Sequence, residues 1–176
     1  STTETEGNKL HADPVWSPDG KTMAYVHNDP NGRFHIYTRS FDNGSFGQPV
    51  RITEPNDFGR SRLYFARYDD HIQPTFSPDG KEIILVSNRG ITLGSGAIWR
   101  APLEPDAMSK ATRILREETL YRTKPNWSPD GKRILYSSHR GSQYDNLYVY
   151  PVHDGEPLQL TRDPWDHFDP AWSPDG

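Results

Sequence analysis

The stretch P-V-W-S-P-D-G-K at residues 14–21 decides the fold, because it returns three times along the chain. It reappears as P-T-F-S-P-D-G-K at residues 74–81, as P-N-W-S-P-D-G-K at residues 125–132 and as P-A-W-S-P-D-G at residues 170–176. The aromatic residues of successive copies stand 60, 51 and 45 residues apart, which is the range of four-stranded propeller blades with variable loops. The repeat therefore predicts one blade per copy.

The Ser-Pro-Asp-Gly part of each copy predicts a tight turn between two strands. Proline sets φ for the second turn position, aspartate tolerates the third, and glycine adopts positive φ without a Cβ clash. After each turn, apolar residues alternate with period two, as a second strand requires. A third strand is indicated by the pairs Ile36-Tyr37, Ile98-Trp99 and Leu147-Tyr148, and a short fourth strand by residues 50–53, 113–115 and 158–161.

We therefore expect an all-β chain, with residues 1–176 forming a partial β-propeller of four-stranded antiparallel blades. Three blades would be complete, and the first strand of a fourth would lead into Trp172. The 16 Pro and 14 Gly fit many short elements, and the aromatic content of 12% argues against disorder. Because a propeller usually has about four to eight blades, we expect either a segment of a longer polypeptide or self-association of two copies.

Composition excludes some classes of function. A formal net charge of −4 offers no general attraction for nucleic acid or an anionic membrane. No apolar stretch approaches the roughly 20 residues of a transmembrane helix, and with no cysteine there is no disulfide or thiolate metal site. The chain contains neither a Gly-x-Ser-x-Gly nucleophile elbow nor a His-Glu-x-x-His zinc motif. We expect a binding module and no catalytic residue in this segment.

Candidate binding residues emerge when the repeats are aligned on their aromatic residues. Five residues before the aromatic stand His11, His71, Arg122 and His167, and three residues before it stand Asp13, Gln73, Lys124 and Asp169. In a regular strand, residues two apart point to the same side, so we expect both sets at the mouth of the central channel. The loop after the second strand adds Asn28, Asp29, Asn88, Arg89, His139 and Arg140.

Three interpretations of this rim stay open. It is a polar, partly cationic surface for a protein or carbohydrate-like ligand, or a set of groups that only bridge neighbouring blades. In the third interpretation His11, His71 and His167 hold a divalent metal ion, since imidazole is a common ligand for such ions. The long connection from Glu54 to Thr75 is either a second binding element or a hairpin that caps a blade. The repeated tryptophans are expected in the core, and the repeated aspartates in turns.

The pattern Pro-x-Trp-Ser-Pro-Asp-Gly-Lys, followed by an Ile-Tyr third strand and a Leu-Thr ending, resembles the TolB-like six-bladed propeller repeat. The segment from Tyr136 to Gly176 looks most like propellers fused to bacterial amidohydrolase-type proteins. The first resemblance implies a non-catalytic scaffold of an exported, periplasmic or secreted bacterial protein, because TolB propellers bind a lipoprotein partner in the periplasm. The alternatives are the propeller part of a larger amidohydrolase or peptidase, or a metal-dependent enzyme similar to oligogalacturonate lyases.

Overall fold

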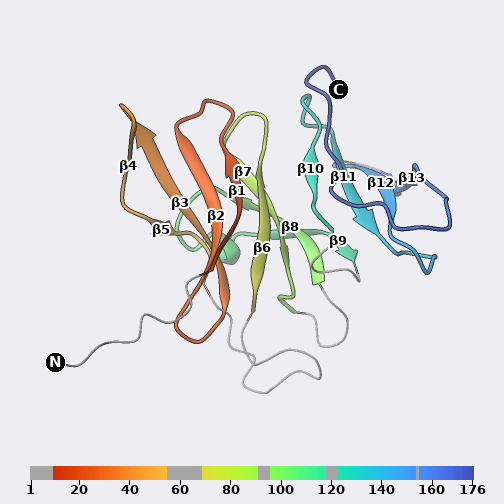
Figure 1. Ribbon diagram of the computed structural model, residues 1–176, viewed down its shortest axis with the longest axis horizontal. Coiled ribbons are helices and arrows are strands. Elements are labelled where there is room, and N and C mark those ends of the chain that lie inside the picture. The colour runs from red at the N-terminus through yellow and green to blue at the C-terminus, as the bar shows by residue number, and fades with distance from the viewer. Residues whose placement is uncertain (1–9, 55–68, 91–95, 118–122, 154) are drawn as a thin grey trace.

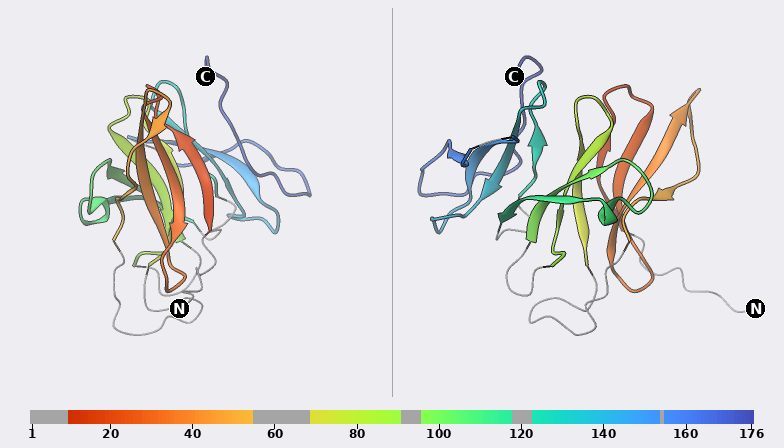
Figure 2. Two further views of the ribbon diagram at one scale, coloured as in Figure 1. Left: turned by 60° about the vertical axis from the view of Figure 1, so that its left-hand side comes forward. Right: turned by 180° about the vertical axis from the view of Figure 1, so that it is seen from behind.

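Three antiparallel sheets follow one another in chain order (Figure 1), and Figure 2 shows the same succession from two further sides. The computed structural model describes residues 10–54, 69–90, 96–117, 123–153 and 155–176. The one helical element among these residues is a short 3₁₀ turn, η1 (Ala107–Ser109). The all-β prediction is confirmed, and we call the three sheets blades 1, 2 and 3.

The strands of blades 2 and 3 pair in the order of the chain, whereas in blade 1 both β4 and β5 pair with β3. Blade 1 contains β1 (His11–Trp16), β2 (Thr22–Asn28), β3 (Phe34–Asp42), β4 (Ser45–Phe46) and β5 (Val50–Arg51). Blade 2 contains β6 (His71–Phe76), β7 (Glu82–Ser87), β8 (Gly96–Pro102) and β9 (Thr112–Glu117). Blade 3 contains β10 (Asn126–Trp127), β11 (Arg133–Ser138), β12 (Asn146–Pro151) and β13 (Leu158–Gln159).

The Ser-Pro-Asp-Gly turns close in the same way in every blade. In blade 1 the Ser17 hydroxyl donates to Asp19 Oδ1 at 2.6 Å and accepts the Thr22 amide at 2.9 Å, while the Lys21 amide donates to Asp19 at 3.0 Å. Gly20 has a φ of 68°, a conformation that only glycine adopts freely. Blades 2 and 3 repeat these bonds at residues 77–82 and 128–133.

The blades are joined by the aromatic residue that ends each first strand. Phe76 of blade 2 packs in one cluster with Ala24, Val26 and Ile36 of blade 1. Trp127 of blade 3 packs with Ile84 and Ile98 of blade 2. Each aromatic side chain therefore fills the seam, meaning the contact surface between its own blade and the preceding one.

The tight turns stack along the same seams. A Cβ built on Gly80 would lie 3.7 Å from Pro18 Cδ, one on Gly131 3.7 Å from Pro78, and one on Gly176 3.9 Å from Pro129. The glycine of each turn thus lies in van der Waals range of the proline in the preceding turn. The repeat that makes the turns also sets how far apart successive blades stand.

No blade of the described residues packs in front of Trp16, and 49% of its surface is exposed. Blade 1 departs from the repeat here, because β3 runs on into a hairpin with β4, which the sequence did not suggest. Phe41 and Phe46 of that hairpin lie 5.4 and 5.9 Å from the Trp16 ring, centroid to centroid. The hairpin covers part of the tryptophan that a seam covers elsewhere.

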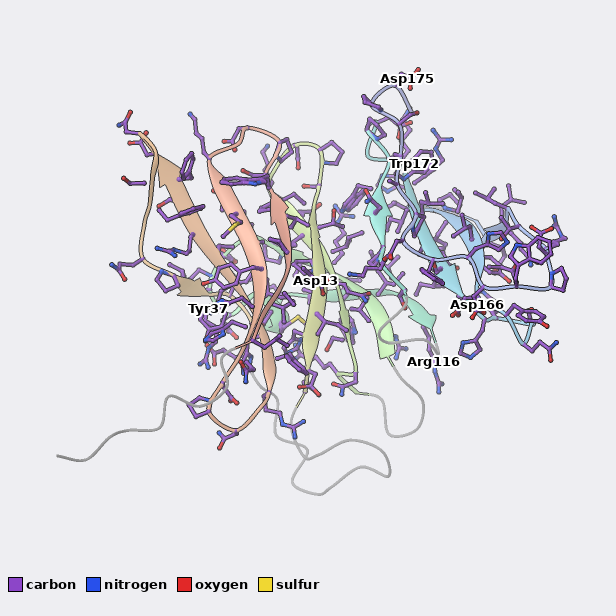
Figure 3. All side chains as sticks on the ribbon, in the orientation of Figure 1. Asp13, Tyr37, Arg116, Asp166, Trp172 and Asp175 are labelled. Carbon is purple, nitrogen blue, oxygen red and sulfur yellow. The ribbon has the colours of Figure 1, made fainter. Side chains whose placement is uncertain are left out.

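The predicted first strand of a fourth blade is only partly formed. Residues 167–172 are not assigned as a strand, since in the other blades this segment pairs with a second strand that follows the turn. Trp172 nevertheless lies beside blade 3 (Figure 3), where its Nε1 donates to the Asn126 carbonyl at 3.1 Å. The Arg133 guanidinium stands 4.9 Å from its ring centroid. The seam contact thus forms without the strand ladder.

We expect Trp127→Ala and Trp16→Ala to lower the stability of the fold by different amounts, because only Trp127 is buried in a seam. Trp127→Ala removes a side chain that is 7% exposed and should destabilise the fold by about 3–5 kcal/mol. Trp16→Ala removes a half-exposed ring and should cost less than about half of that. Urea unfolding followed by circular dichroism measures both. If both variants lose the same stability, burial of the aromatic ring in the seam is not the source of its stabilising effect.

The turns also predict sensitivity to acid. The hydroxyl of the preceding serine lowers the pKa of Asp19, Asp79, Asp130 and Asp175 below the ordinary value. Because the folded state favours the charged form, this stabilisation is complete above about pH 4 and is lost as pH falls through the lowered pKa. Asp79→Asn keeps an acceptor for Ser77 without a titrating group, so its stability should fall less between pH 5 and 2.5.

Chemical unfolding at successive pH values measures that loss. Asp42→Asn, in the hairpin of blade 1 and outside the turns, serves as the control and should keep the pH dependence of the original chain. If Asp79→Asn and Asp42→Asn lose stability with the same slope, the turn carboxylate does not contribute.

Candidate functional site

A β-bulge interrupts the first strand of blades 1 and 2 at the same place. The pairing register shifts between Ala12 and Val15 and again between Ile72 and Thr75. A residue in the left-handed conformation stands three positions before each aromatic, and all four belong to the predicted rim: Asp13 (φ 48°), Gln73 (φ 53°), Lys124 (φ 40°) and Asp169 (φ 53°). Bulges re-aim side chains, so the regular alternation assumed for this strand does not hold.

The four left-handed residues line one pocket of about 210 Å³, which we call the axial pocket. Its wall is completed by the proline that follows each of them, together with Val15, Thr75 and Asn126. Residues up to 156 positions apart in sequence are therefore brought together. The position three before the aromatic converges as the sequence predicted, and Figure 3 places Asp13 in the middle of the molecule.

Lys124 connects the three blades across the axial pocket. Its ammonium forms an ion pair with Asp13 of blade 1, and its backbone amide donates to Gln73 Oε1 of blade 2 at 2.8 Å. The ion pair is partly exposed, with 37% and 24% of the two side chains accessible, so its net contribution to stability is at most about 1 kcal/mol. The contacts position the side chains more than they stabilise the fold.

The described rim is not cationic, contrary to the sequence interpretation. Lys124 is balanced by Asp13, and the Asp169 carboxylate adds a further negative charge. Arg89 lies 5.8 Å from the Trp99 ring centroid and donates to the Met108 carbonyl, whereas Arg140 points toward Glu156 at 4.0 Å. Arg122 lies outside the described residues. Arg89 and Arg140 thus contact groups outside the axial pocket, whose lining includes neither of them.

The histidines five positions before the aromatic have three different surroundings. The His11 ring stacks on His27 with centroids 4.4 Å apart, His71 is fully buried, and His167 Nε2 lies 3.1 Å from Asp163 Oδ2. Within the described ranges, no three His, Asp or Glu side chains are close enough to share a metal ion. The arc of imidazoles around the axis, which the metal interpretation requires, is not formed by His11, His71 and His167.

Comparisons with known proteins bear on this geometry. No family model matches the chain. It is 30% identical over 174 residues to the uncharacterized peptidase YuxL of Bacillus subtilis, a match that covers 98% of this chain and 22% of that protein. It is 30% identical over 121 residues to the Tol-Pal system protein TolB of Hydrogenovibrio crunogenus, covering 69% of this chain and 22% of TolB. The chain thus spans about a fifth of both relatives.

The arrangement of strands matches a solved structure as well. The crystal structure of TolB from Acinetobacter baumannii superposes with a TM-score of 0.60 at 23% identity, over 85% of this chain and 32% of that one. The chain is a TolB-like β-propeller. Its three blades and the Trp172 contact form part of a ring, and a peptidase is also among its relatives.

Asparagine residues of the predicted rim hold the entry of the first strands in this TolB-like propeller. Asn28 Oδ1 accepts the Leu10 amide at 2.7 Å, and Asn88 Oδ1 accepts the Asp70 amide at 2.9 Å. Asn28 ends and Asn88 follows the second strand of its blade, and both donors stand six positions before the aromatic. His139 follows the second strand of blade 3, with Nδ1 3.7 Å from Asp145 Oδ1. Each of these three contacts joins two segments of the same blade, so they are not the bridges between neighbouring blades that the second interpretation expects.

Two aspartates that join blades were missed by the sequence analysis. Asp70 Oδ1 accepts the Phe34 amide of blade 1 at 3.1 Å, and Asp166 Oδ1 accepts the Asp145 amide of blade 3 at 3.0 Å. Both aspartates stand six positions before the aromatic, followed in each case by histidine. That repeated Asp-His pair was the available signal.

The long connection between blades 1 and 2 is described only in part. Residues 55–68, with Arg60, Arg62, Tyr64, Phe65, Arg67 and Tyr68, lie outside the described residues, as do residues 91–95 between β7 and β8. Asp69 and Asp70, which close the long connection, are buried. Among the described residues there is no helix with the length and hydrophobicity that crossing a bilayer requires.

Proposed function

We propose that this TolB-like propeller is a non-catalytic binding module that takes a segment of a partner protein at the axial pocket. The observation that carries the proposal is the convergence of Asp13, Gln73, Lys124 and Asp169 from successive repeats on one pocket. A non-glycine residue in a sparsely populated backbone region costs about 1–3 kcal/mol and persists where the surrounding structure enforces it. Four such residues, all facing one pocket, support a role in binding.

The size of the axial pocket favours a protein over a carbohydrate. Pockets that hold a whole small molecule usually measure about 300–1,000 Å³, and the axial pocket has about 210 Å³. That volume suits a single inserted side chain. Two carboxylates against one ammonium leave a negative charge, so a basic side chain is the better fit.

The proposal predicts where short peptides bind. We expect acetylated pentapeptides with a central arginine, flanked by alanines, to shift the amide resonances of Gln73, Lys124 and Asp169 in ¹⁵N NMR spectra. Asp169→Asn should weaken this binding about tenfold, because it removes the charge that faces the guanidinium. Asp42→Asn carries the same change outside the pocket and should bind as the original chain does.

Two results would contradict the proposal. Shifts confined to other surfaces would move the site away from the axial pocket, and equal affinity for both asparagine variants would remove the role of Asp169. A chito-oligosaccharide is tested in parallel as a carbohydrate ligand. Tight binding of this sugar without binding of the peptides would show that the axial pocket binds carbohydrate and not a protein segment.

The propeller of a larger peptidase is the second candidate. It is favoured by the 30% identity to the peptidase YuxL, which extends over 98% of this chain. In that case the propeller would admit or hold substrate, and the reacting groups would lie outside these residues. The expected likeness to amidohydrolase propellers stays a prediction.

This second candidate makes a direct prediction for the chain by itself. A panel of aminoacyl and dipeptidyl p-nitroanilides should release no p-nitroaniline when incubated with the 176-residue chain. Turnover that is abolished by mutating a residue of this chain would place a catalytic group within it, and the binding-module proposal would then fail.

We further propose an exported, periplasmic or secreted, bacterial protein, on the strength of the likeness to TolB. Self-association is proposed through the apolar edge of blade 1. There Trp16, Phe46 and Val50 are 49%, 41% and 45% exposed.

A further inference from the structure

Two histidines from neighbouring blades meet in the seam between blades 1 and 2. His35 belongs to β3 and His71 to β6, and their ring centroids are 6.2 Å apart with an interplanar angle of 38°. Both side chains are 0% exposed. An imidazole that takes up a proton here would bring a charge into a buried contact next to a second titratable ring.

The pair occurs at this seam alone among the described repeats. In the alignment on the third strand, the position of His35 is held by Ala97 in blade 2 and by Asn146 in blade 3. Blade 3 therefore shows that asparagine fits this position of the fold. His35→Asn is a substitution that the repeat itself already contains.

The charged groups around the pair are largely committed to one another. Arg51 pairs with Glu54 at 2.6 Å, and Arg33 pairs with Asp70 at 3.3 Å. The carboxylate facing His35 is Asp29, whose Oδ2 lies 3.6 Å from Nε2. Asp69, before β6, is buried, and the residue of β7 that pairs with His71 is the neutral Ser87.

The Asp29 carboxylate does not offset the effect of burial on the pKa of His35. Burial, with a further contribution from Arg51, lowers the pKa of His35 below its ordinary value despite the opposing effect of Asp29. Burial raises the pKa of Asp29, but the amides of Arg33 and Asn31 outweigh it and the net pKa is lowered. The neutral imidazole is therefore the form that the seam accepts.

The seam is connected to the axial pocket through β6. Gln73, which lines the pocket and accepts the Lys124 amide, lies two residues after His71 on this strand. Asp70, one residue before His71, accepts the Phe34 amide of blade 1. A movement of β6 away from blade 1 would displace both contacts together.

We propose that the His35–His71 pair is a pH-sensitive joint, so that mild acidification loosens blade 1 from blade 2 and weakens binding at the axial pocket. The second half rests on the proposed function, whereas the first half does not. The sign follows from linkage: a histidine with a lowered pKa in the folded state stabilises the fold above about pH 6.5, and this stability is lost as pH falls toward the folded pKa.

The experiment compares the original chain with His35→Asn, and with His153→Asn as a matched control at an exposed position of blade 3. Between pH 7 and 5, the urea midpoint of the original chain and of the control should fall by about 0.5 M. His35→Asn should show less than about half of that fall. The protection of the Phe34 and Ile36 amides against hydrogen exchange, taken relative to the intrinsic exchange rate at each pH, should fall with acid in the original chain only.

NMR titration of the imidazole resonances gives an independent readout if His35→Asn folds poorly. His35 should protonate below pH 6.5. Protonation of His35 at or above that pH, or equal slopes for His35→Asn and His153→Asn, would overturn the joint.

The arginine pentapeptide probe tests the connection to the axial pocket. Its dissociation constant should rise at least about threefold between pH 7 and 5 in the original chain and stay nearly constant in His35→Asn. A loosened seam with unchanged peptide binding would overturn the connection and leave the joint intact. If the peptide binds at neither pH, the proposed function fails together with the connection, and the unfolding data still decide the joint.

Discussion

The structure depends on the insertion of one aromatic ring from each blade into the seam with the blade before it. Phe76 and Trp127 are 6% and 7% exposed in these seams, and burial of such large rings is the strongest apolar contribution that a short-stranded sheet can make. Gly80, Gly131 and Gly176 each face the proline of the preceding turn, where an added Cβ would come within 3.9 Å of the proline ring. A blade without this contact would expose one face of its sheet.

The axial pocket is a consequence of the same repeat. The ring and the tight turn fix the end of each first strand, and the bulge three residues earlier turns one side chain toward the axis. Because the blades follow one another around that axis, equivalent residues meet although their chemistry differs. Asp13, Gln73, Lys124 and Asp169 share a backbone conformation and present two carboxylates, an amide and an ammonium.

The propeller fold of this chain occurs in proteins with different functions. TolB proteins and peptidases share this arrangement of blades with the present chain, and a shared fold does not settle which site is used. Three local features of this chain bear on which site it uses. They are the mixed polar lining of the axial pocket, the His35–His71 pair in the seam between blades 1 and 2, and the aromatic hairpin on blade 1.

Sequence alone determined the features that depend on residues close together in the chain. The repeated W/F-S-P-D-G stretch predicted the turns, because the hydrogen bonds of each turn lie within six successive residues, such as Ser17 to Thr22. It also placed Trp127 in the core and the repeated aspartates in turns, but the same expectation was wrong for Trp16, which is 49% exposed.

Tertiary structure decided everything that depends on a backbone irregularity or on a contact between blades. The bulge at Asp13 and Gln73 has no sequence signature beyond the following proline, and it separated the histidines from the pocket that they were expected to share. Asp70 and Asp166 became seam contacts because their amide partners, Phe34 and Asp145, belong to another repeat. The meeting of His35 with His71 was likewise set by the packing of blade 2 on blade 1, because residues 36 positions apart become neighbours only when the seam closes.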